Sequence, residues 1–351
     1  MERLADRAPF GNTGLEVSPI IFGTSCLGNL YQALPWDTKL DIMREWFKWV
    51  EAPVALDSAG KYGAGLALEV IGKGLRELGV RPEQAMISNK LGWLRVPLRT
   101  PEPTFEPGAW ADLEHDAEQK ISFEGILECH EQGCELLGWD YNPELVSVHD
   151  PDEYLAQAAS DDERAARLRD VVGAYRALGA LKAEGRVKAV GVGSKDWRVI
   201  RKLAHAVELD WVMFACSLTI MHHPPELLAF MGELKAKGIA IINSAVFHAG
   251  FLTGGKFFDY REVSPDDEAD RELFEWRDRF FAVCERFRVV PAEACVQFGM
   301  SVPGVVSIAL NTSKPARVQQ NVAAVQAEIP DEFWAAMKGD GLVAQDYPYV
   351  G

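Results

Sequence analysis

Four side chains able to carry protons follow short apolar runs in the first half of the chain: Asp57, Tyr62, Lys90 and His149. Asp57 closes the run Val54-Ala-Leu56, and Tyr62 stands five residues further on, before a glycine. Lys90 and His149 each close a similar run. A short apolar run that ends in polar residues and glycine is typical of a buried strand that opens into a loop. If such strands are parallel, their ends would gather a carboxylate, a phenol, an ammonium group and an imidazole.

These four groups together suit proton transfer to or from an oxygen atom. A free tyrosine has a pKa of about 10, which is too high for easy proton exchange near neutrality. A nearby ammonium group lowers that pKa, whereas burial alone raises it. Lys90 could supply the positive charge, Asp57 could hold Lys90, and His149 could donate to a substrate oxygen as charge develops. The set suits carbonyl reduction or alcohol oxidation, for which a nicotinamide cofactor must supply or accept the hydride.

Eight short apolar runs of similar spacing alternate with stretches of helical period. The predicted strands cover residues 20–23, 54–57, 86–90, 146–149, 189–193, 211–216, 239–242 and 305–310. The predicted helices cover residues 37–51, 66–78, 121–137, 163–184, 197–206, 225–236, 272–287, 292–301, 315–328 and 330–338. This alternation predicts an α/β fold, a (β/α)8 TIM barrel that forms one domain over residues 1–351. A β-hairpin at the turn Asn12-Thr-Gly14 is expected to precede it. An open doubly wound sheet is disfavoured, because the glycines of Ile71-Gly-Lys-Gly74 fall inside a helix.

Two long loops interrupt the alternation. Residues 91–117 are rich in Pro, Trp and Phe and have no helical period, and residues 247–263 form the second loop. Loops of this length in a compact domain are usually functional. We therefore expect Trp93, Phe105 and Trp110 to line a substrate pocket, with plain packing as the alternative.

The composition argues against several classes of partner. The chain has 351 residues, 48% of them apolar, and a formal net charge of −16. So strong a negative charge argues against nucleic acids and anionic membranes as partners. Because the N-terminus has no apolar signal region and no apolar run reaches the length of a membrane helix, we expect a cytoplasmic protein. The six cysteines include no C-x-x-C pair, which indicates reduced thiols.

No metal site is expected from the histidines and cysteines. His222 and His223 are adjacent and cannot easily share one ion, and the group Cys129, His130 and Cys134 lacks a full ligand set. A metal-dependent hydrolase on the same fold is therefore a weak alternative, kept because a fold alone does not determine function.

The motifs that carry the chemistry resemble those of the aldo-keto reductase family. The resemblance rests on Asp57-Ser-Ala-x-x-Tyr-Gly63, on Lys90, and on Val148-His-Asp-Pro-Asp152. Residues 12–19, 185–193 and 311–321 also match the family's pattern. Within the family, residues 213–219 and 243–254 are most similar to the sugar 1-dehydrogenase branch, which acts on fucose, galactose, threo-aldoses and, in some members, pyridoxal.

The resemblance implies a barrel that binds NADP or, less often, NAD. Tyr62 would be the general acid/base, His149 would bind the substrate oxygen, and Lys90 with Asp57 would set the pKa of Tyr62. The pyrophosphate would lie across residues 247–252 and the adenosine phosphate near residues 311–317. The implied cofactor-binding residues are Gly23, Ser194, Phe247, His248, Gly250, Leu252, Asn311, Thr312, Arg317, Gln320 and Asn321. Many NADP-binding members have a lysine where Asn311 stands, which brings NAD, or both cofactors, into consideration.

The predicted function is the NAD(P)-dependent interconversion of an aldose, at C1 of its hemiacetal, with its lactone. A general NADPH-dependent aldehyde or ketone reductase is the main alternative. A regulatory protein that binds the cofactor but turns over little is a third reading. The expected partner is a small molecule, an aldose or an aldehyde, and a homo-oligomer is compatible with the sequence.

Overall fold

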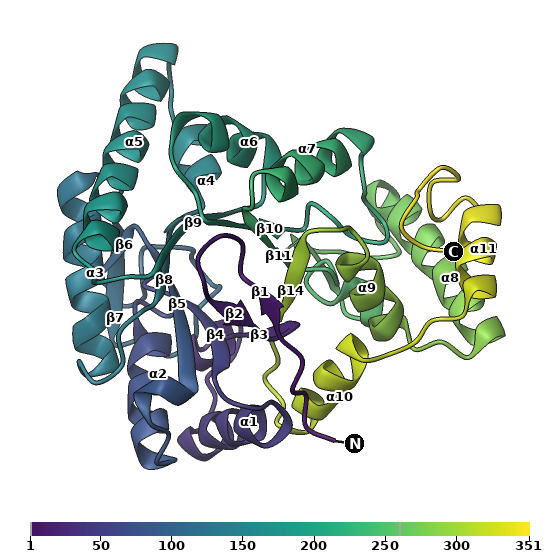
Figure 1. Cartoon of the computed structure of the whole chain (residues 1–351), viewed down its shortest axis with the longest axis horizontal. Helices are drawn as coiled ribbons and strands as arrows, with labels where there is room; N and C mark the ends of the chain where they lie inside the picture. Colours follow the sequence, from purple (N-terminus) through teal and green to yellow (C-terminus); the bar gives the residue numbers. More distant parts are fainter. Residues whose placement is uncertain (1, 260) are drawn as a thin grey trace.

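Eight parallel strands close into a barrel in the computed structural model of the chain, which describes residues 2–259 and 261–351 (Figure 1). Met1 and Tyr260, which the predicted domain includes, lie outside the described residues. The barrel strands are β3 (Ile20–Gly23), β4 (Val54–Ala59), β5 (Ala85–Leu91), β8 (Leu145–His149), β9 (Ala189–Ser194), β10 (Trp211–Ala215), β11 (Ala240–Ser244) and β14 (Val305–Leu310). Each lies beside the next barrel strand of the chain, and β14 pairs with β3. The predicted (β/α)8 TIM barrel is confirmed.

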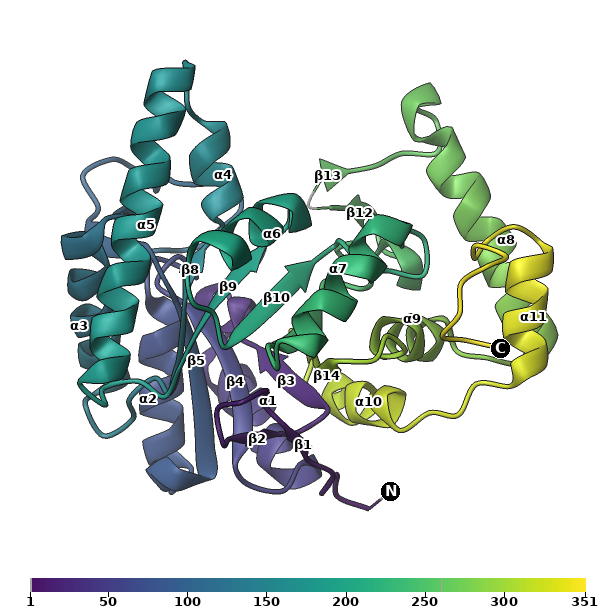
Figure 2. The same ribbon diagram turned by 45° about the horizontal axis from the view of Figure 1, so that its top comes forward.

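The α-helices surround this barrel, as Figures 1 and 2 show from two directions. They are α1 (Trp36–Trp49), α2 (Leu66–Glu77), α3 (Phe123–Leu137), α4 (Pro151–Ala156), α5 (Asp161–Ala183), α6 (Trp197–Ala206), α7 (Pro225–Ala236), α8 (Arg271–Phe287), α9 (Pro291–Met300), α10 (Ala316–Val325) and α11 (Asp331–Gly339). The sequence predicted all of these except α4, a short helix directly after β8. No helix in the described ranges combines the length and the apolar character needed to cross a membrane.

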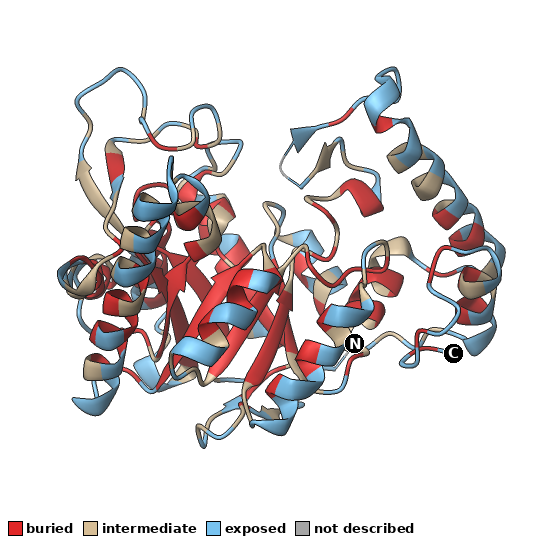
Figure 3. Cartoon of the chain, turned by 90° about the horizontal axis from the view of Figure 1, so that it is seen from above, coloured by how far each residue is buried: buried red, intermediate tan, exposed pale blue. Residues whose placement is uncertain are grey.

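The core lies between the strands and the helices and also inside the barrel. Figure 3 shows the barrel strands as buried and the outer faces of the helices as exposed. Phe10, Trp211 and Met213 belong to the cluster of apolar side chains that fills the barrel interior. Phe10 lies between strands β1 (Ala8–Pro9) and β2 (Glu16–Val17), which pair antiparallel. The predicted N-terminal hairpin is therefore confirmed, and its Phe10 side chain is part of this interior cluster.

The prediction of a loop over residues 91–117 is wrong at both ends of that stretch. Strands β6 (Trp93–Pro97) and β7 (His115–Gln119) pair antiparallel, from Trp93 beside Gln119 to Pro97 beside His115. The residues of β6 are partly exposed, so the strand lacks the apolar run by which a buried strand is identified. We call residues 92–120, which connect β5 to α3, the aromatic insertion.

The second long loop contains short regular pieces as well. These are the 3-10 turn η3 (Phe251–Thr253) and the antiparallel strands β12 (Phe257–Phe258) and β13 (Arg261–Glu262). The other 3-10 turns are η1 (Ser25–Gly28), η2 (Pro82–Gln84) and η4 (Glu268–Asp270).

Candidate active site

The carboxylate of Asp57 and the ammonium group of Lys90 form a buried ion pair at the carboxyl ends of β4 and β5. Each side chain is 5% exposed, and Lys90 Nζ lies 2.5 Å from Asp57 Oδ2. Lys90 also donates to the carbonyl oxygen of Ser58, and the hydroxyl of Ser88 donates to Asp57 Oδ1, both at 3.3 Å. The register of β4 and β5 places Asp57 beside Ser88. Because an unpaired buried charge is very costly, these contacts hold both groups in place.

Tyr62 lies in the tight turn that follows β4. Its N–H donates to the carbonyl oxygen of Ala59 at 3.0 Å. The next residue, Gly63, has a φ of 63°, and a Cβ there would lie 2.3 Å from the carbonyl oxygen of Gly28. Only glycine combines this backbone conformation with so close an approach to η1. The turn carries the Tyr62 ring to a position where its centre lies 4.9 Å from Lys90 Nζ.

His149 ends β8, and its ring meets the Tyr62 ring edge-on, with centroids 5.7 Å apart and planes at 84°. Its Nδ1 atom is buried and has no hydrogen-bond partner among the described residues. Its Nε2 atom lies 3.5 Å from Oδ2 of Asp150. The structure thus brings together the four side chains that the sequence singled out, at the carboxyl ends of three neighbouring strands.

The pKa of Tyr62 is raised in the protein, whereas we expected Lys90 to lower it. Burial, followed by the negative charges of Asp57, Asp150 and Glu106, raises the pKa of Tyr62 well above 10. The expectation that Lys90 lowers this pKa is therefore wrong for the protein by itself. The reason is that Lys90 is already balanced by Asp57 at 2.5 Å, so its charge does little to offset the burial of the phenol.

The pKa of His149 is shifted as well. Burial, followed by the positive charges of Lys61, Lys90 and Lys195, lowers the pKa of His149 well below 6.5. The imidazole is therefore neutral near pH 7 and offers one N–H donor and one acceptor nitrogen.

Lys61 is a buried residue of the site that the sequence analysis missed. Its side chain is 5% exposed, and its Nζ lies 2.6 Å from Glu106, 3.3 Å from Glu153 and 3.7 Å from Asp150. Glu153 in turn lies 2.5 Å from Lys195 Nζ. This charged cluster joins the turn before Tyr62 to the aromatic insertion and to α4. The sequence did hold a signal, because Lys61 and Asp150 directly adjoin the predicted residues Tyr62 and His149.

The predicted substrate-wall residues Trp93, Phe105 and Trp110 gather beside Tyr62. The ring centroids of Tyr62 and Trp110 are 5.9 Å apart, those of Trp110 and Phe105 are 6.2 Å apart, and those of Phe105 and Trp93 are 5.9 Å apart. The indole N–H of Trp110 donates to Glu106 at 2.7 Å, so Glu106 holds both Trp110 and Lys61. The site therefore has an aromatic side and, next to it, a charged side.

The residues predicted for the nicotinamide and pyrophosphate lie at the ends of β9 and β11. Ser194 ends β9, and its hydroxyl contacts only the carbonyl oxygen of Asp196, at 3.5 Å, among the described residues. Phe247, His248 and Gly250 follow β11 in the turn before η3. The side chain of Leu252 is fully buried in the main hydrophobic core, so only its backbone could reach a ligand.

His248 lies in a hydrogen-bonded network. Its Nε2 lies 2.7 Å from the hydroxyl of Thr219, its Nδ1 lies 2.7 Å from Asp259, and its ring stacks on Phe258. Cys216, His248 and Asp259 have ligand atoms within 4.8 Å of one another. Both nitrogens of His248 are within hydrogen-bond distance of a partner, and burial raises the pKa of the Cys216 thiol.

The residues predicted for the adenosine phosphate follow β14. Asn311 donates to the hydroxyl of Ser25 at 2.8 Å, and a Cβ on Gly23 would lie 3.2 Å from the Cβ of Asn311. Thr312 accepts from the N–H of Lys314, and Arg317, Gln320 and Asn321 belong to the first turns of α10. The guanidinium of Arg317 is exposed and has no recorded side-chain partner in the described ranges.

A cavity of about 580 Å³ opens between the segments that follow β9, β10 and β11. Lys195, Ser217, His222, His248 and Asp259 are among its lining residues. It therefore adjoins the charged cluster at Lys195 and the predicted pyrophosphate turn at His248.

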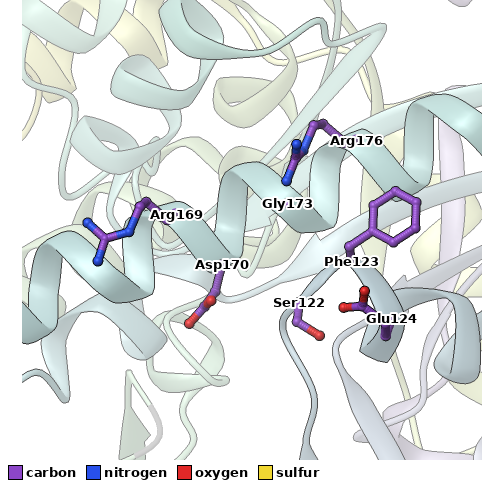
Figure 4. A pocket seen from close by; sticks show the side chains of 7 residues that line it. All are labelled: Ser122, Phe123, Glu124, Arg169, Asp170, Gly173 and Arg176. Atoms are coloured by element: carbon purple, nitrogen blue, oxygen red, sulfur yellow. The ribbon is translucent and has the colours of Figure 1, made fainter.

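A second cavity, of about 370 Å³, lies away from this region (Figure 4). Figure 4 shows its lining residues, which include Arg169, Asp170 and Arg176 on α5 and Ser122, Phe123 and Glu124 at the start of α3. Its lining residues include none of the residues predicted for the site. Its mixed charges, on the outer helices of the barrel, indicate a surface hollow between two packed helices.

Comparison with known proteins identifies similar sequences and structures. The model of the Aldo/keto reductase family matches residues 19–339. A pyridoxal 4-dehydrogenase of Microbacterium luteolum is 28% identical and aligns over 97% of this chain and 99% of its own length. A D-threo-aldose 1-dehydrogenase of a Pseudomonas species is also 28% identical, over 94% of this chain and 96% of its own length. The solved holo form of an aldo-keto reductase from Bacillus halodurans has a TM-score of 0.67 at 20% identity, covering 96% of each chain.

Proposed function

We propose that this chain, which belongs to the aldo/keto reductase family, interconverts an aldose, at C1 of its hemiacetal, with the corresponding lactone. It is an oxidoreductase that uses NAD(P) and acts on a small molecule. One observation carries the finer proposal: Asp57, Tyr62, Lys90 and His149 converge at the end of the barrel where enzymes of this fold carry out their chemistry.

The predicted cofactor-binding residues have the chemistry that a dinucleotide requires. The exposed guanidinium of Arg317 lies in the first turn of α10, where backbone N–H groups and the helix dipole favour a phosphate. The hydroxyl of Ser194 has hydrogen-bonding capacity to spare, as does the buried Nδ2 atom of Asn321, which has no partner among the described residues. When bound, the nicotinamide ring supplies or accepts the hydride and, in its oxidised form, adds a positive charge.

In the proposed reaction Tyr62 exchanges a proton with the reacting oxygen. Because its pKa is held well above 10, Tyr62 is protonated near neutrality and is ready to donate in the direction of reduction. In the direction of oxidation the phenol must first lose its proton. His149 is neutral near pH 7 and would donate to the same oxygen through Nε2. The Lys90–Asp57 pair would fix the Tyr62 ring by its position 4.9 Å from the ring centre.

The walls of the site support a sugar as the substrate. Sugars present apolar C–H faces, which pack on aromatic rings, and hydroxyl groups, which hydrogen-bond to carboxylates and ammonium groups. Trp110 and Phe105 offer aromatic rings for the C–H faces. Lys61 and Asp150 offer an ammonium group and a carboxylate for the hydroxyl groups. A relative named for D-threo-aldose 1-dehydrogenase supports the same substrate class. Pyridoxal is a second candidate, because another relative is named for it and pyridoxal also forms a cyclic hemiacetal.

Initial-rate measurements test this proposal. L-fucose, D-arabinose, L-galactose and pyridoxal would be oxidised with NAD and with NADP, and 4-nitrobenzaldehyde would be reduced with NADH and NADPH. We expect lactone from at least one aldose and a loss of about a hundredfold or more in kcat/KM with Tyr62→Phe. If every sugar is inert while 4-nitrobenzaldehyde is reduced, the chain is a general aldehyde reductase instead.

A further inference from the structure

Asp150, the residue after His149, has an unusual backbone conformation. Its φ is 45° and its ψ is 56°, which is the left-handed region, at the point where β8 ends and α4 begins. Asp and Asn enter this region more readily than other non-glycine residues, and residues held in it cluster at functional sites. The N–H of Asp150 donates to the carbonyl oxygen of Gly193 at 3.1 Å, and its carbonyl oxygen accepts from the N–H of Tyr154 at 3.2 Å. The backbone is thus held from both sides.

Capping of α4 does not explain the Asp150 carboxylate. Asp150 occupies the N-cap position of α4, yet its side chain makes no capping hydrogen bond. The N-cap residue of α6, Asp196, shows the usual arrangement, in which the carboxylate accepts from the N–H of Arg198. An aspartate at an N-cap normally behaves in this second way. The Asp150 side chain therefore serves another purpose.

The carboxylate of Asp150 is nearly buried and poorly satisfied. The side chain is 11% exposed, and its contacts within the described ranges are long: 3.5 Å to Nε2 of His149 and 3.7 Å to Nζ of Lys61. Charge-assisted hydrogen bonds of carboxylates are normally about 2.7–2.9 Å long. Burial, offset by Lys195 and Lys61, raises the pKa of Asp150 to about 6, so the group is still ionised near pH 7. Within residues 2–259 and 261–351, the recorded contacts of this anionic acceptor are no shorter than 3.5 Å.

We propose that Asp150 determines substrate specificity by accepting a hydrogen bond from the hydroxyl group on the carbon next to the reacting carbon. The inference rests on the proposed function, because it places the reacting oxygen between Tyr62 and Nε2 of His149. A hydroxyl on the adjacent carbon lies within about one hydrogen-bond length of that oxygen. The carboxylate, 3.5 Å from the same Nε2 atom, is within reach of that hydroxyl. The preferred substrates are then 2-hydroxy aldehydes and aldoses.

Lys61 completes this arrangement. With its Nζ 3.7 Å from Asp150 and 2.6 Å from Glu106, it limits the movement of the carboxylate and links it to the aromatic insertion. A substrate hydroxyl bound to Asp150 would therefore lie between the charged side of the site and Trp110. A substrate without this hydroxyl would leave the buried carboxylate with only its long contacts to Lys61 and His149, which lowers the transition-state binding of that substrate.

The test uses two aldehydes that differ by one hydroxyl group, 2-hydroxypropanal and propanal, reduced with NADPH or NADH. We expect wild-type protein to prefer 2-hydroxypropanal by about tenfold to a hundredfold in kcat/KM, which is the effect of one hydrogen bond to a charged group. Asp150→Gly, which fits the left-handed backbone, should remove this preference. Asp150→Asn, which also tolerates that conformation and keeps the side-chain shape, should reduce it.

Glu153→Gln is the matched control. Glu153 contacts the same Lys61 at 3.3 Å, but the structure records no contact of its carboxylate with His149, so this variant should keep the wild-type preference. The proposal is overturned if the wild-type protein shows no preference for 2-hydroxypropanal over propanal. It is also overturned if Asp150→Gly keeps that preference, including the case in which kcat/KM falls by the same factor for both aldehydes. A preference that depends on Asp150 in a protein inert toward all sugars would refute the proposed function and leave this inference standing. If the wild-type protein oxidises aldoses but Asp150→Gly keeps the preference for 2-hydroxypropanal, the proposed function stands and this inference is refuted.

Discussion

The ammonium group of Lys61 lies 2.6 Å from Oε1 of Glu106, which joins the turn before Tyr62 to the middle of the aromatic insertion. Glu106 also accepts the indole N–H of Trp110 at 2.7 Å. One carboxylate therefore positions a buried cation and an aromatic ring that faces Tyr62. In this way the charged and the aromatic sides of the site are mechanically linked.

Replacing Glu106 should loosen this link. We expect Glu106→Gln to raise KM for the substrate several-fold with a smaller change in kcat, because the aromatic wall is less well positioned while the four proposed catalytic groups stay in place. Glu102→Gln is the control, since Glu102 is exposed in the same insertion and its side chain has no recorded partner in the described ranges. Steady-state measurements of KM and kcat for both variants and for wild-type protein test this expectation. Equal KM values for Glu106→Gln and wild-type protein would contradict the link.

Removing the Tyr62 hydroxyl should affect chemistry and spare cofactor binding. We expect Tyr62→Phe to lower kcat/KM by about 10²–10⁴, the usual contribution of a positioned acid or base. Titration of intrinsic tryptophan fluorescence with NADPH should give the wild-type dissociation constant. Tyr349→Phe changes a residue that is 36% exposed and should leave both quantities unaltered. Retention of most of the activity by Tyr62→Phe would contradict its proposed role.

The buried pair of Asp57 and Lys90 should show strong coupling in stability. Either single variant, Asp57→Asn or Lys90→Met, leaves a buried charge without its partner, which typically costs about 3–5 kcal/mol of unfolding free energy. The double variant should lose less than the sum of the two, because neither charge remains. Urea unfolding of the four proteins measures this coupling. Additive losses would show that the 2.5 Å contact contributes little.

The ionisation of Tyr62 can be followed directly in the protein without cofactor. Because burial and nearby carboxylates raise its pKa well above 10, Tyr62 should stay protonated through pH 10. The tyrosinate absorbance of wild-type protein and of Tyr62→Phe should then rise in parallel up to that pH. An extra tyrosinate signal in wild-type protein between pH 7 and pH 9 would show instead that Lys90 lowers the pKa of Tyr62.

Asp150 should lower the stability of the protein near neutral pH. Its folded pKa of about 6 lies above its usual value of 3.8, so the native state binds the proton more tightly than the unfolded state does. Ionisation therefore costs stability as the pH rises from about 4 to about 6, by roughly 3 kcal/mol at most. Asp150→Asn should be more stable than wild-type protein at pH 7 and should match it below pH 4. Chemical unfolding at the two pH values checks this, and a less stable variant at pH 7 would contradict it.

The barrel and its main side chains could be predicted because each depends on a local pattern. The runs at β4, β5 and β8 are apolar and end in polar residues, so both the strands and the positions of Asp57, Lys90 and His149 follow from the sequence. The hairpin of β6 and β7 could not be predicted in this way, because its partly exposed strands have no apolar run.

The charged cluster required the three-dimensional structure. Lys61 and Glu106 are far apart in the sequence, and nothing in either segment indicates that one neutralises the other. The same holds for the pKa of Tyr62, whose direction depends on how many carboxylates surround the ring and on the compensation of Lys90 by Asp57. Residue types and spacing identify such groups, but the balance of charges depends on distances.

The aromatic insertion joins β5 to α3, whereas the residues proposed to hold the dinucleotide follow β9, β11 and β14, apart from Gly23 at the end of β3. The residues proposed to determine substrate specificity thus lie in the first half of the chain. Most of the residues proposed to bind the cofactor lie in the second half. An exchange of residues 92–120 between related barrels, together with Lys61 and Asp150, would transfer a substrate preference as a unit while the coenzyme stays the same. New specificities could therefore arise in this lineage by replacement of the aromatic insertion together with these two residues.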